Sequence, residues 1–245
     1  MKRKFWNWIK NQDESGAEMR TLFLNGEISD ETWYGDEVTP KLFKDELQGG
    51  KGPICVWINS PGGDVFAAAQ IYNMLMDYPY DVTVMIDGLA ASAASVIAMA
   101  GTKVCMSPVA MMMIHNPATI AIGDSEEMKR AVKMLDEVKE SIMNAYEIKT
   151  SLPRDRISKL MDAESWFNAK KAVELGFADE IMFSEGSTDI ADVKVSDAAE
   201  PFVFSRAAVT NSLLGKLIPS KGEANVTDNS TPKEQLMKRL SLISH

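Results

Sequence analysis

Histidine and cysteine are scarce in this chain of 245 residues, which has two of each, and His245 is the last residue. The sequence contains no H-E-x-x-H or C-x-x-C spacing, so we expect no metal site. It also lacks the G-x-x-x-x-G-K-[ST] and G-x-G-x-x-G motifs, which argues against ATP hydrolysis by this chain and against a bound dinucleotide. No cofactor is expected. Cys55 and Cys105 lie far apart in apolar runs and form no disulfide framework, so we expect a cytoplasmic location.

Positively charged residues are fewer than negatively charged ones. The chain has 26 Lys and Arg residues and 35 Asp and Glu residues, for a net charge of −9. This sign opposes general nucleic-acid binding. The longest weakly polar stretch, residues 82–101, is interrupted by Asp87, Ser92 and Ser95, so no membrane span is expected. Residues 1–10 are basic and aromatic but have no apolar core, unlike a secretory signal.

Hydrophobic periodicity is dense from residue 20 to residue 183, and both flanks are more polar. We therefore expect three parts: a basic-aromatic N-terminal arm at 1–19, one domain at 20–183, and a low-complexity C-terminal tail at 184–245. Both extensions are expected to be flexible, with a short helix at 232–243.

Short apolar runs alternate with helical patterns inside the domain. This alternation predicts βαβ units and an α/β fold with a mainly parallel, buried sheet. The expected strands lie at 21–24, 54–58, 82–86 and 104–106, and the expected helices at 36–47, 65–76 and 124–149. The last helix would span roughly 39 Å. Two interpretations stay open for it: one end projects toward another subunit, or the helix lies on the sheet with its back to solvent.

Two strand ends contain turns with chemical potential. Ile-Asn-Ser-Pro-Gly-Gly at 58–63 follows one buried strand, and its glycines allow a backbone geometry that presents free N–H groups. Asp87 to Ser95 follows another strand and places Ser92 near a helix N-terminus, where negative charge is favoured. Taken alone, the glycine motif at 58–63 is typical of an ordinary turn, and the serine among alanines at 87–95 is typical of close helix packing. His115 is the one histidine away from the chain end.

Five motifs in a fixed order connect these features. They are Gly-Glu-Ile at 26–28, Ile-Asn-Ser-Pro-Gly-Gly at 58–63, Gly-x-Ala-Ala-Ser at 88–92, Met-Ile-His-x-Pro at 113–117 and Ala-x-x-Ala-Val-Glu-x-Gly at 169–176. Together they resemble the ClpP family of serine peptidases over about residues 20–183. The resemblance implies an α/β fold of the ClpP/crotonase type, a spiral of ββα units with a projecting handle helix.

The resemblance also implies roles for individual residues. Ser92 matches the nucleophile and His115 the general base. The third member of the triad falls on Glu164, where the family commonly has aspartate, and Asp162 is the alternative. The oxyanion hole would use the backbone N–H groups of Gly63 and Ala93.

Other residues near these motifs have simpler interpretations. We expect Ser95 to be packed rather than reactive, and Ser60 to stabilise its turn. The Met111–Met113 run is expected in the core, with a substrate cleft as the alternative. Residues 118–122 resemble the family's segment that pairs with substrate as an added strand.

The two extensions and the stretch 162–167 look more like the ClpP-related head maturation proteases of phage and prophage. This implies a serine endopeptidase that trims capsid and scaffold precursors in the bacterial host cytoplasm, within proheads. A homo-oligomeric ring is expected, acting on protein or peptide substrates. Three alternatives stay open: a general ClpP-type subunit working with a Clp ATPase, a catalytically inactive assembly scaffold, and acyl-CoA chemistry on the related crotonase fold.

Overall fold

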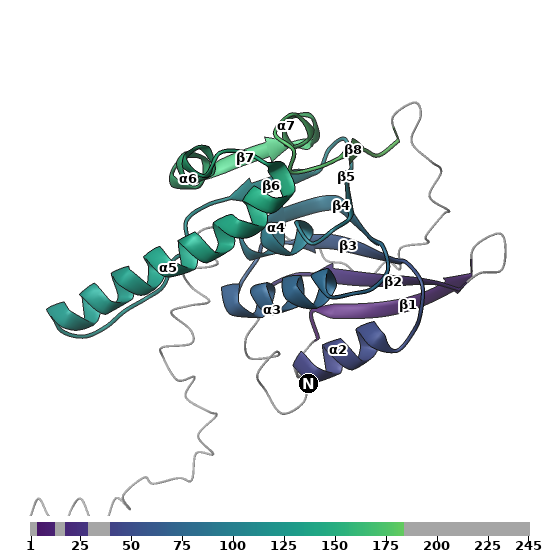
Figure 1. Cartoon of the computed structure of the whole chain (residues 1–245), viewed down its shortest axis with the longest axis horizontal. Helices are drawn as coiled ribbons and strands as arrows, with labels where there is room; N and C mark the ends of the chain where they lie inside the picture. Colours follow the sequence, from purple (N-terminus) through teal and green to yellow (C-terminus); the bar gives the residue numbers. More distant parts are fainter. Residues whose placement is uncertain (1–3, 13–17, 29–39, 184–245) are drawn as a thin grey trace, which may run out of the picture. The chain divides into compact units, whose positions relative to one another are not determined.

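The computed structural model describes residues 4–12, 18–28 and 40–183, all of them in the first of two units, Met1–Arg206, into which the chain divides. Within these residues eight strands form one sheet (Figure 1). The strands are β1 (Trp6–Gln12), β2 (Glu18–Asn25), β3 (Ile54–Ser60), β4 (Val82–Ala91), β5 (Lys103–Met106), β6 (Met111–Ile114), β7 (Ser165–Asn168) and β8 (Glu180–Ile181). The helices are α2 (Pro40–Gln48), α3 (Val65–Met76), α4 (Ala93–Ala98), α5 (Ser125–Thr150), α6 (Arg154–Asp162) and α7 (Ala169–Glu174).

The sheet is mainly parallel, which confirms the expected α/β class. Its order is β1-β2-β3-β4-β5-β8, and β6 pairs with both β4 and β7. Only the β1–β2 and β6–β7 pairs are antiparallel among the described strands. Because β3, β4 and β6 run in the same direction, their carboxyl ends lie at one edge, which is where parallel sheets commonly bind ligands.

The helix boundaries follow from side-chain caps. The expected helix 65–76 is α3, and the Asp64 carboxylate accepts a hydrogen bond of 2.6 Å from the Ala67 amide at its start. The expected helix 124–149 is α5, and Asp124 caps it through the amides of Glu126 and Glu127. The helix expected at 36–47 is represented by α2, whereas residues 36–39 lie outside the described part.

The long helix α5 has two different halves. Its buried side chains begin only at the middle of the helix, at Val138, Ile142, Met143, Ala145 and Tyr146. Met128 and Val132, in the first half, are 38% and 57% exposed. Figure 1 shows this half extending away from the sheet. The first half of the helix therefore projects from the sheet, and its contact with another subunit stays a prediction.

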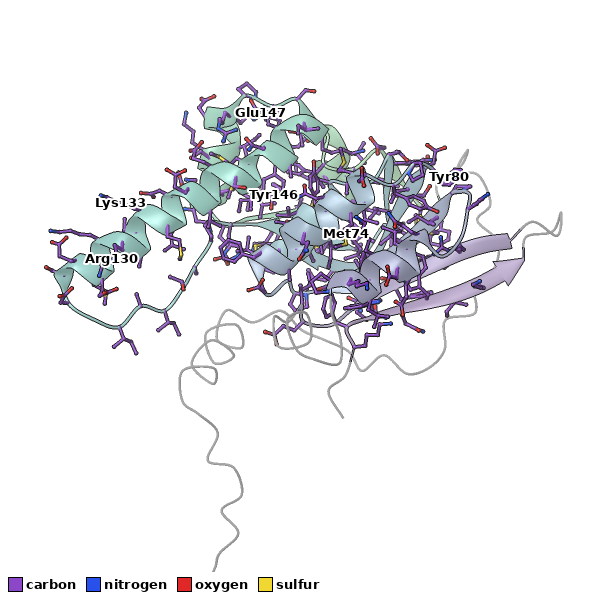
Figure 2. All side chains as sticks on the ribbon, turned by 60° about the horizontal axis from the view of Figure 1, so that its bottom comes forward. Met74, Tyr80, Arg130, Lys133, Tyr146 and Glu147 are labelled. Atoms are coloured by element: carbon purple, nitrogen blue, oxygen red, sulfur yellow. The ribbon has the colours of Figure 1, made fainter. Side chains whose placement is uncertain are left out.

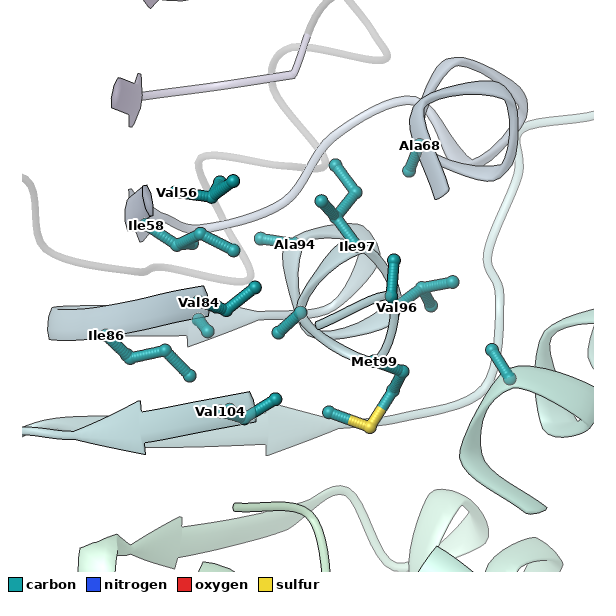
Figure 3. Close-up of a cluster of buried hydrophobic side chains, with 14 of the residues drawn as sticks. Val56, Ile58, Ala68, Val84, Ile86, Ala94, Val96, Ile97, Met99 and Val104 are labelled. Carbon is teal, nitrogen blue, oxygen red and sulfur yellow. The ribbon is translucent and has the colours of Figure 1, made fainter. Parts of the chain in front are cut away.

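Hydrophobic packing on one face of the middle strands holds α4 against the sheet. Alternate residues of β3, β4 and β5 point to one face and pack against α4 (Figure 3): Val56, Ile58, Val84, Ile86 and Val104. Each such side chain, when fully buried, contributes about 1.5–3 kcal/mol relative to an exposed one. Small residues such as Ala94 let the helix approach the strands closely. The segment that joins β4 to α4 is thus held rigidly.

The N-terminal segment takes part in the sheet. Residues 1–19 were expected to form a separate arm, yet Trp6–Gln12 pair antiparallel with β2. Trp6 is 2% exposed and its Nε1 donates to Glu46 Oε2 at 2.8 Å. The buried Arg20 guanidinium donates to the carbonyls of Glu46 and Leu47 at the end of α2. The described part of the arm therefore belongs to the domain, because burial of its aromatic side chains ties it to α2.

The two extensions otherwise fall largely outside the description. The tail expected at 184–245, with its helix at 232–243, lies outside the described residues. None of the helices that the structure describes has the length and hydrophobicity needed to cross a membrane. Cys55 and Cys105 are free, buried thiols.

Candidate active site

Ser92 lies between the end of β4 and the start of α4, and its backbone is unusual. Its φ is 54° and its ψ −127°, a region that residues with a Cβ rarely adopt and that costs about 1–3 kcal/mol. Hydrogen bonds on both sides hold it there. The Ser92 amide donates to Met113 O at 2.9 Å, and the Ser92 carbonyl accepts from the Ser95 amide at 3.0 Å. The turn presents the partly buried side chain at the carboxyl edge of the sheet.

His115 directly follows β6, which pairs in parallel with β4 so that Met113 lies beside Ala91. Because the two strands run in the same direction, Ser92, which follows β4, and His115, which follows β6, lie at the same edge of the sheet. The Nε2 atom of His115 lies 2.8 Å from Ser92 Oγ. With Nε2 unprotonated, the serine hydroxyl donates this bond, and the imidazole is placed to take the hydroxyl proton.

The glycine turn after β3 lies directly against Ser92. A Cβ added at Gly62 would come within 2.7 Å of both Ala91 O and Ser92 Cβ, and one at Gly63 within 1.9 Å of Ile28 O. Both glycines have positive φ, 96° and 145°. A side chain at Gly62 would push the turn away from Ser92, and one at Gly63 would push it away from Ile28, so glycine is required at both positions.

Two backbone amides beside Ser92 face away from the neighbouring elements that the structure describes, so they can donate to an outside partner. Ala93 is the first residue of α4, and a first-turn amide has no partner within its helix. Near Gly63, the Ile28 amide donates to Gly62 O at 2.8 Å and the Asp64 amide donates to Ile28 O at 2.7 Å. The Gly63 amide therefore faces the side opposite Ile28. Such amides are suited to hold a developing negative charge.

The two acids considered for the third position have different surroundings. In the antiparallel β6–β7 pair, Ile114 lies opposite Ser165, and His115 and Glu164 are the next residues beyond this last pair. Glu164 is partly buried and has a φ of 48°. The Asp162 carboxylate instead receives hydrogen bonds from Lys139 Nζ at 2.6 Å and from Asn116 Nδ2 at 2.9 Å. These bonds, the Lys139 bond first, lower the pKa of Asp162.

The neighbouring residues lie as the sequence predicts. Ser60 Oγ donates to Gly26 O at 2.6 Å and accepts from the Gly62 amide at 3.1 Å, so it stabilises the turn. Ser95 is fully buried. Met112 and Met113 are also fully buried, which confirms the core interpretation for these two residues.

Sequence reasoning missed two polar side chains of α5 that reach toward the site. Tyr146 OH lies 2.8 Å from Ser95 Oγ, and Lys139 pairs with Asp162. The sequence does carry one indication of the first contact. Tyr146 lies on the apolar face of a long helix, and a buried tyrosine hydroxyl usually needs a hydrogen-bond partner. Among the residues that the structure describes, no group of three or more His, Cys, Asp or Glu side chains is placed to hold a metal ion.

Comparisons with known proteins agree with this geometry. The sequence profile described as Clp protease matches residues 11–185. The chain is 31% identical over 165 residues to the ATP-dependent Clp protease proteolytic subunit 2 of Thermobifida fusca, covering 66% of this chain and 80% of that protein. It is 32% identical to the ATP-dependent Clp protease proteolytic subunit of Porphyromonas gingivalis (66% and 73%). For subunit 1 of Chlamydia muridarum the identity is 30% over 177 residues (70% and 91%).

Proposed function

Because the chain belongs to the Clp protease family and is a serine-type endopeptidase, we propose that Ser92 is its nucleophile, His115 its general base and Glu164 the acid that orients the imidazole. The observation that carries this proposal is the contact of 2.8 Å between Ser92 Oγ and His115 Nε2. It lies beside a glycine turn at the carboxyl edge of the sheet, where a substrate carbonyl can be reached.

The proposed reaction proceeds through an acyl-enzyme. Ser92 Oγ attacks the carbonyl carbon of the scissile peptide bond while His115 Nε2 takes the hydroxyl proton. The C–N bond then breaks as the imidazolium gives that proton to the leaving amine. Water, deprotonated by the same imidazole, then attacks the acyl carbon; the bond from that carbon to Ser92 Oγ breaks, and the imidazolium returns the proton to Oγ. The amides of Gly63 and Ala93 stabilise the negative oxygen in both steps, and the Ala93 side chain matters little because only the N–H acts.

Glu164 suits the third position better than Asp162. Glu164 and His115 directly follow the last pair of the β6–β7 ladder, Ser165 and Ile114, which supports an interaction between their side chains. The Asp162 side chain is 53% exposed and its carboxylate is paired with Lys139. A carboxylate already paired with a lysine is a weaker partner for an imidazolium.

Substrate binding as an added strand is supported by the segment after His115. Residues 118–122 follow the catalytic edge without a ladder partner in the described part of the chain, and Ile122 is 78% exposed. An extended peptide can pair with such a segment through main-chain hydrogen bonds. This would place the scissile bond next to Ser92.

The proposal is tested by peptide hydrolysis with the full-length chain. In the Ser92→Ala variant, kcat for a fluorogenic peptide should fall by about 10⁶-fold. The Ser141→Ala variant changes an exposed serine of α5 and should retain full activity. Unchanged cleavage in the Ser92→Ala variant would assign the nucleophile to another residue.

The biological use of the peptidase has two candidates, each with its own support. The relatives are named ATP-dependent proteolytic subunits, which favours a general Clp-type subunit, ring-shaped and supplied with unfolded chains by a Clp ATPase. The resemblance of 162–167 and of the extensions supports processing of capsid and scaffold precursors. Coenzyme A chemistry has no support from the relatives.

Cut-site mapping separates these uses. The full chain would be incubated with candidate capsid precursors, or with casein plus a Clp ATPase and ATP, and every product identified by mass spectrometry. A few defined cuts without the ATPase indicate head maturation, whereas short products that require ATP indicate the general subunit. Intact substrates in both reactions, together with a native ring, would indicate an inactive scaffold.

A further inference from the structure

Ser95 connects the nucleophile's backbone to the interior. It lies three residues after Ser92, is fully buried, and its hydroxyl donates to the Ser92 carbonyl at 2.6 Å. The Ser95 amide donates to the same carbonyl at 3.0 Å. One residue thus supplies two hydrogen bonds to the carbonyl of a serine whose backbone is strained.

Tyr146 extends this connection to α5. It lies on the half of the helix that packs on the core (Figure 2), is 1% exposed, and places its hydroxyl 2.8 Å from Ser95 Oγ. Because the single hydroxyl proton of Ser95 is directed at the Ser92 carbonyl, the tyrosine must donate to Ser95 Oγ. Burial raises the pKa of Tyr146 well above its usual range, so the phenol keeps its proton and remains a donor.

We propose that Tyr146 and Ser95 are positioning residues for the nucleophile: the chain Tyr146 OH to Ser95 Oγ to Ser92 O holds the Ser92 backbone in the conformation that directs Oγ at His115. This inference rests on the proposed role of Ser92. Hydrogen bonds in such a buried chain strengthen one another, and the surroundings must hold a strained backbone in place. The contact also joins α5 to the nucleophile, since Tyr146 belongs to that helix and Ser92 follows β4 directly.

Packing alone does not require these hydroxyl groups. The Tyr146 ring contacts Phe177 with centroids 5.7 Å apart, which phenylalanine would preserve, and alanine would fill most of the space of Ser95. Buried hydroxyls are costly unless they are hydrogen-bonded. A positioning role accounts for their being paired with each other and with the nucleophile's carbonyl.

The test compares Tyr146→Phe, Ser95→Ala and the double variant with the wild type, using the full-length protein. Each assembly would be checked by native mass spectrometry, and rates would be measured well below its melting temperature. Tyr146→Phe should lower kcat for a fluorogenic peptide, and the rate of fluorophosphonate labelling of Ser92, by about 5- to 50-fold. KM should stay unchanged, because neither side chain contacts substrate. The double variant should be no slower than Ser95→Ala, since both changes break one chain.

A matched control is Tyr72→Phe, which removes the same atom from a buried tyrosine hydroxyl that has no hydrogen-bond partner among the described residues. It should leave kcat and the labelling rate unchanged. A merely structural role would lower the melting temperature of Tyr146→Phe and leave kcat at the wild-type value, which would overturn the inference. Additive losses in the double variant would overturn it too. If the wild type itself is not labelled at Ser92, the proposed function fails instead.

Discussion

At the scale of single residues, the choice between two acids decides how His115 is oriented. The Glu164→Gln variant should lower kcat by about 10²- to 10⁴-fold, because an amide leaves the imidazolium without its countercharge. The Asp162→Asn variant should lower it less than about threefold, because an exposed pair with Lys139 contributes little. Both variants would be assayed on the same peptide. A larger loss in Asp162→Asn would transfer the role to Asp162.

The two thiols give a second prediction at this scale. Burial first, and then the nearby Cys105, raise the pKa of Cys55 to about 12, and burial also raises the pKa of Cys105. Because only the thiolate is nucleophilic, iodoacetamide near pH 8 should leave both thiols unmodified in the folded protein and modify both in denaturant. Mass spectrometry counts the adducts. Rapid alkylation of the native protein would show that this part of the core opens easily.

At the scale of elements, the two halves of α5 should differ in stability. The first half contributes few buried side chains, and the half from Val138 to Tyr146 packs on the core. Local opening is favoured where few apolar contacts hold a segment. We expect amide hydrogen exchange to be faster over 125–137 than over 138–150, as measured by mass spectrometry on the free chain. Equal protection of the two halves would contradict this prediction.

The elements also show what the sequence could and could not predict. Helices α3 and α5 were placed within one residue, because a three- and four-residue apolar period and an acidic cap define them. Strand β1 was missed because asparagine and lysine interrupt its aromatic residues, and its burial depends on α2. Short strands such as β7 carry little periodicity of their own.

The features of the candidate site also divide into those that the sequence predicts and those that only the folded structure shows. Motif order led to Ser92 and His115, whose contact depends on the pairing of β4 with β6. The positive φ of Ser92 and the hydrogen bond from Tyr146 arise only from tertiary packing between segments 51 residues apart. Residue types alone do not specify such contacts.

At the scale of the whole molecule, the projecting half of α5 exposes two apolar side chains, which we expect to contact a second copy. Met128 and Val132 lie four residues apart on one helix face and are 38% and 57% exposed. A Met128→Glu, Val132→Glu variant should shift the assembly to smaller species in native mass spectrometry, because buried carboxylates oppose association. Lys133→Ala, an exposed change in the same half, should leave the assembly intact. An unchanged mass in the double variant would place the interface elsewhere.

The most direct test of the central claim is the site of covalent capture. Full-length protein would be treated with a fluorophosphonate, digested, and sequenced by tandem mass spectrometry. The account predicts one adduct on Ser92, absent from the Ser92→Ala variant and formed far more slowly in His115→Ala. An adduct on another serine, or labelling that persists after Ser92→Ala, would contradict it.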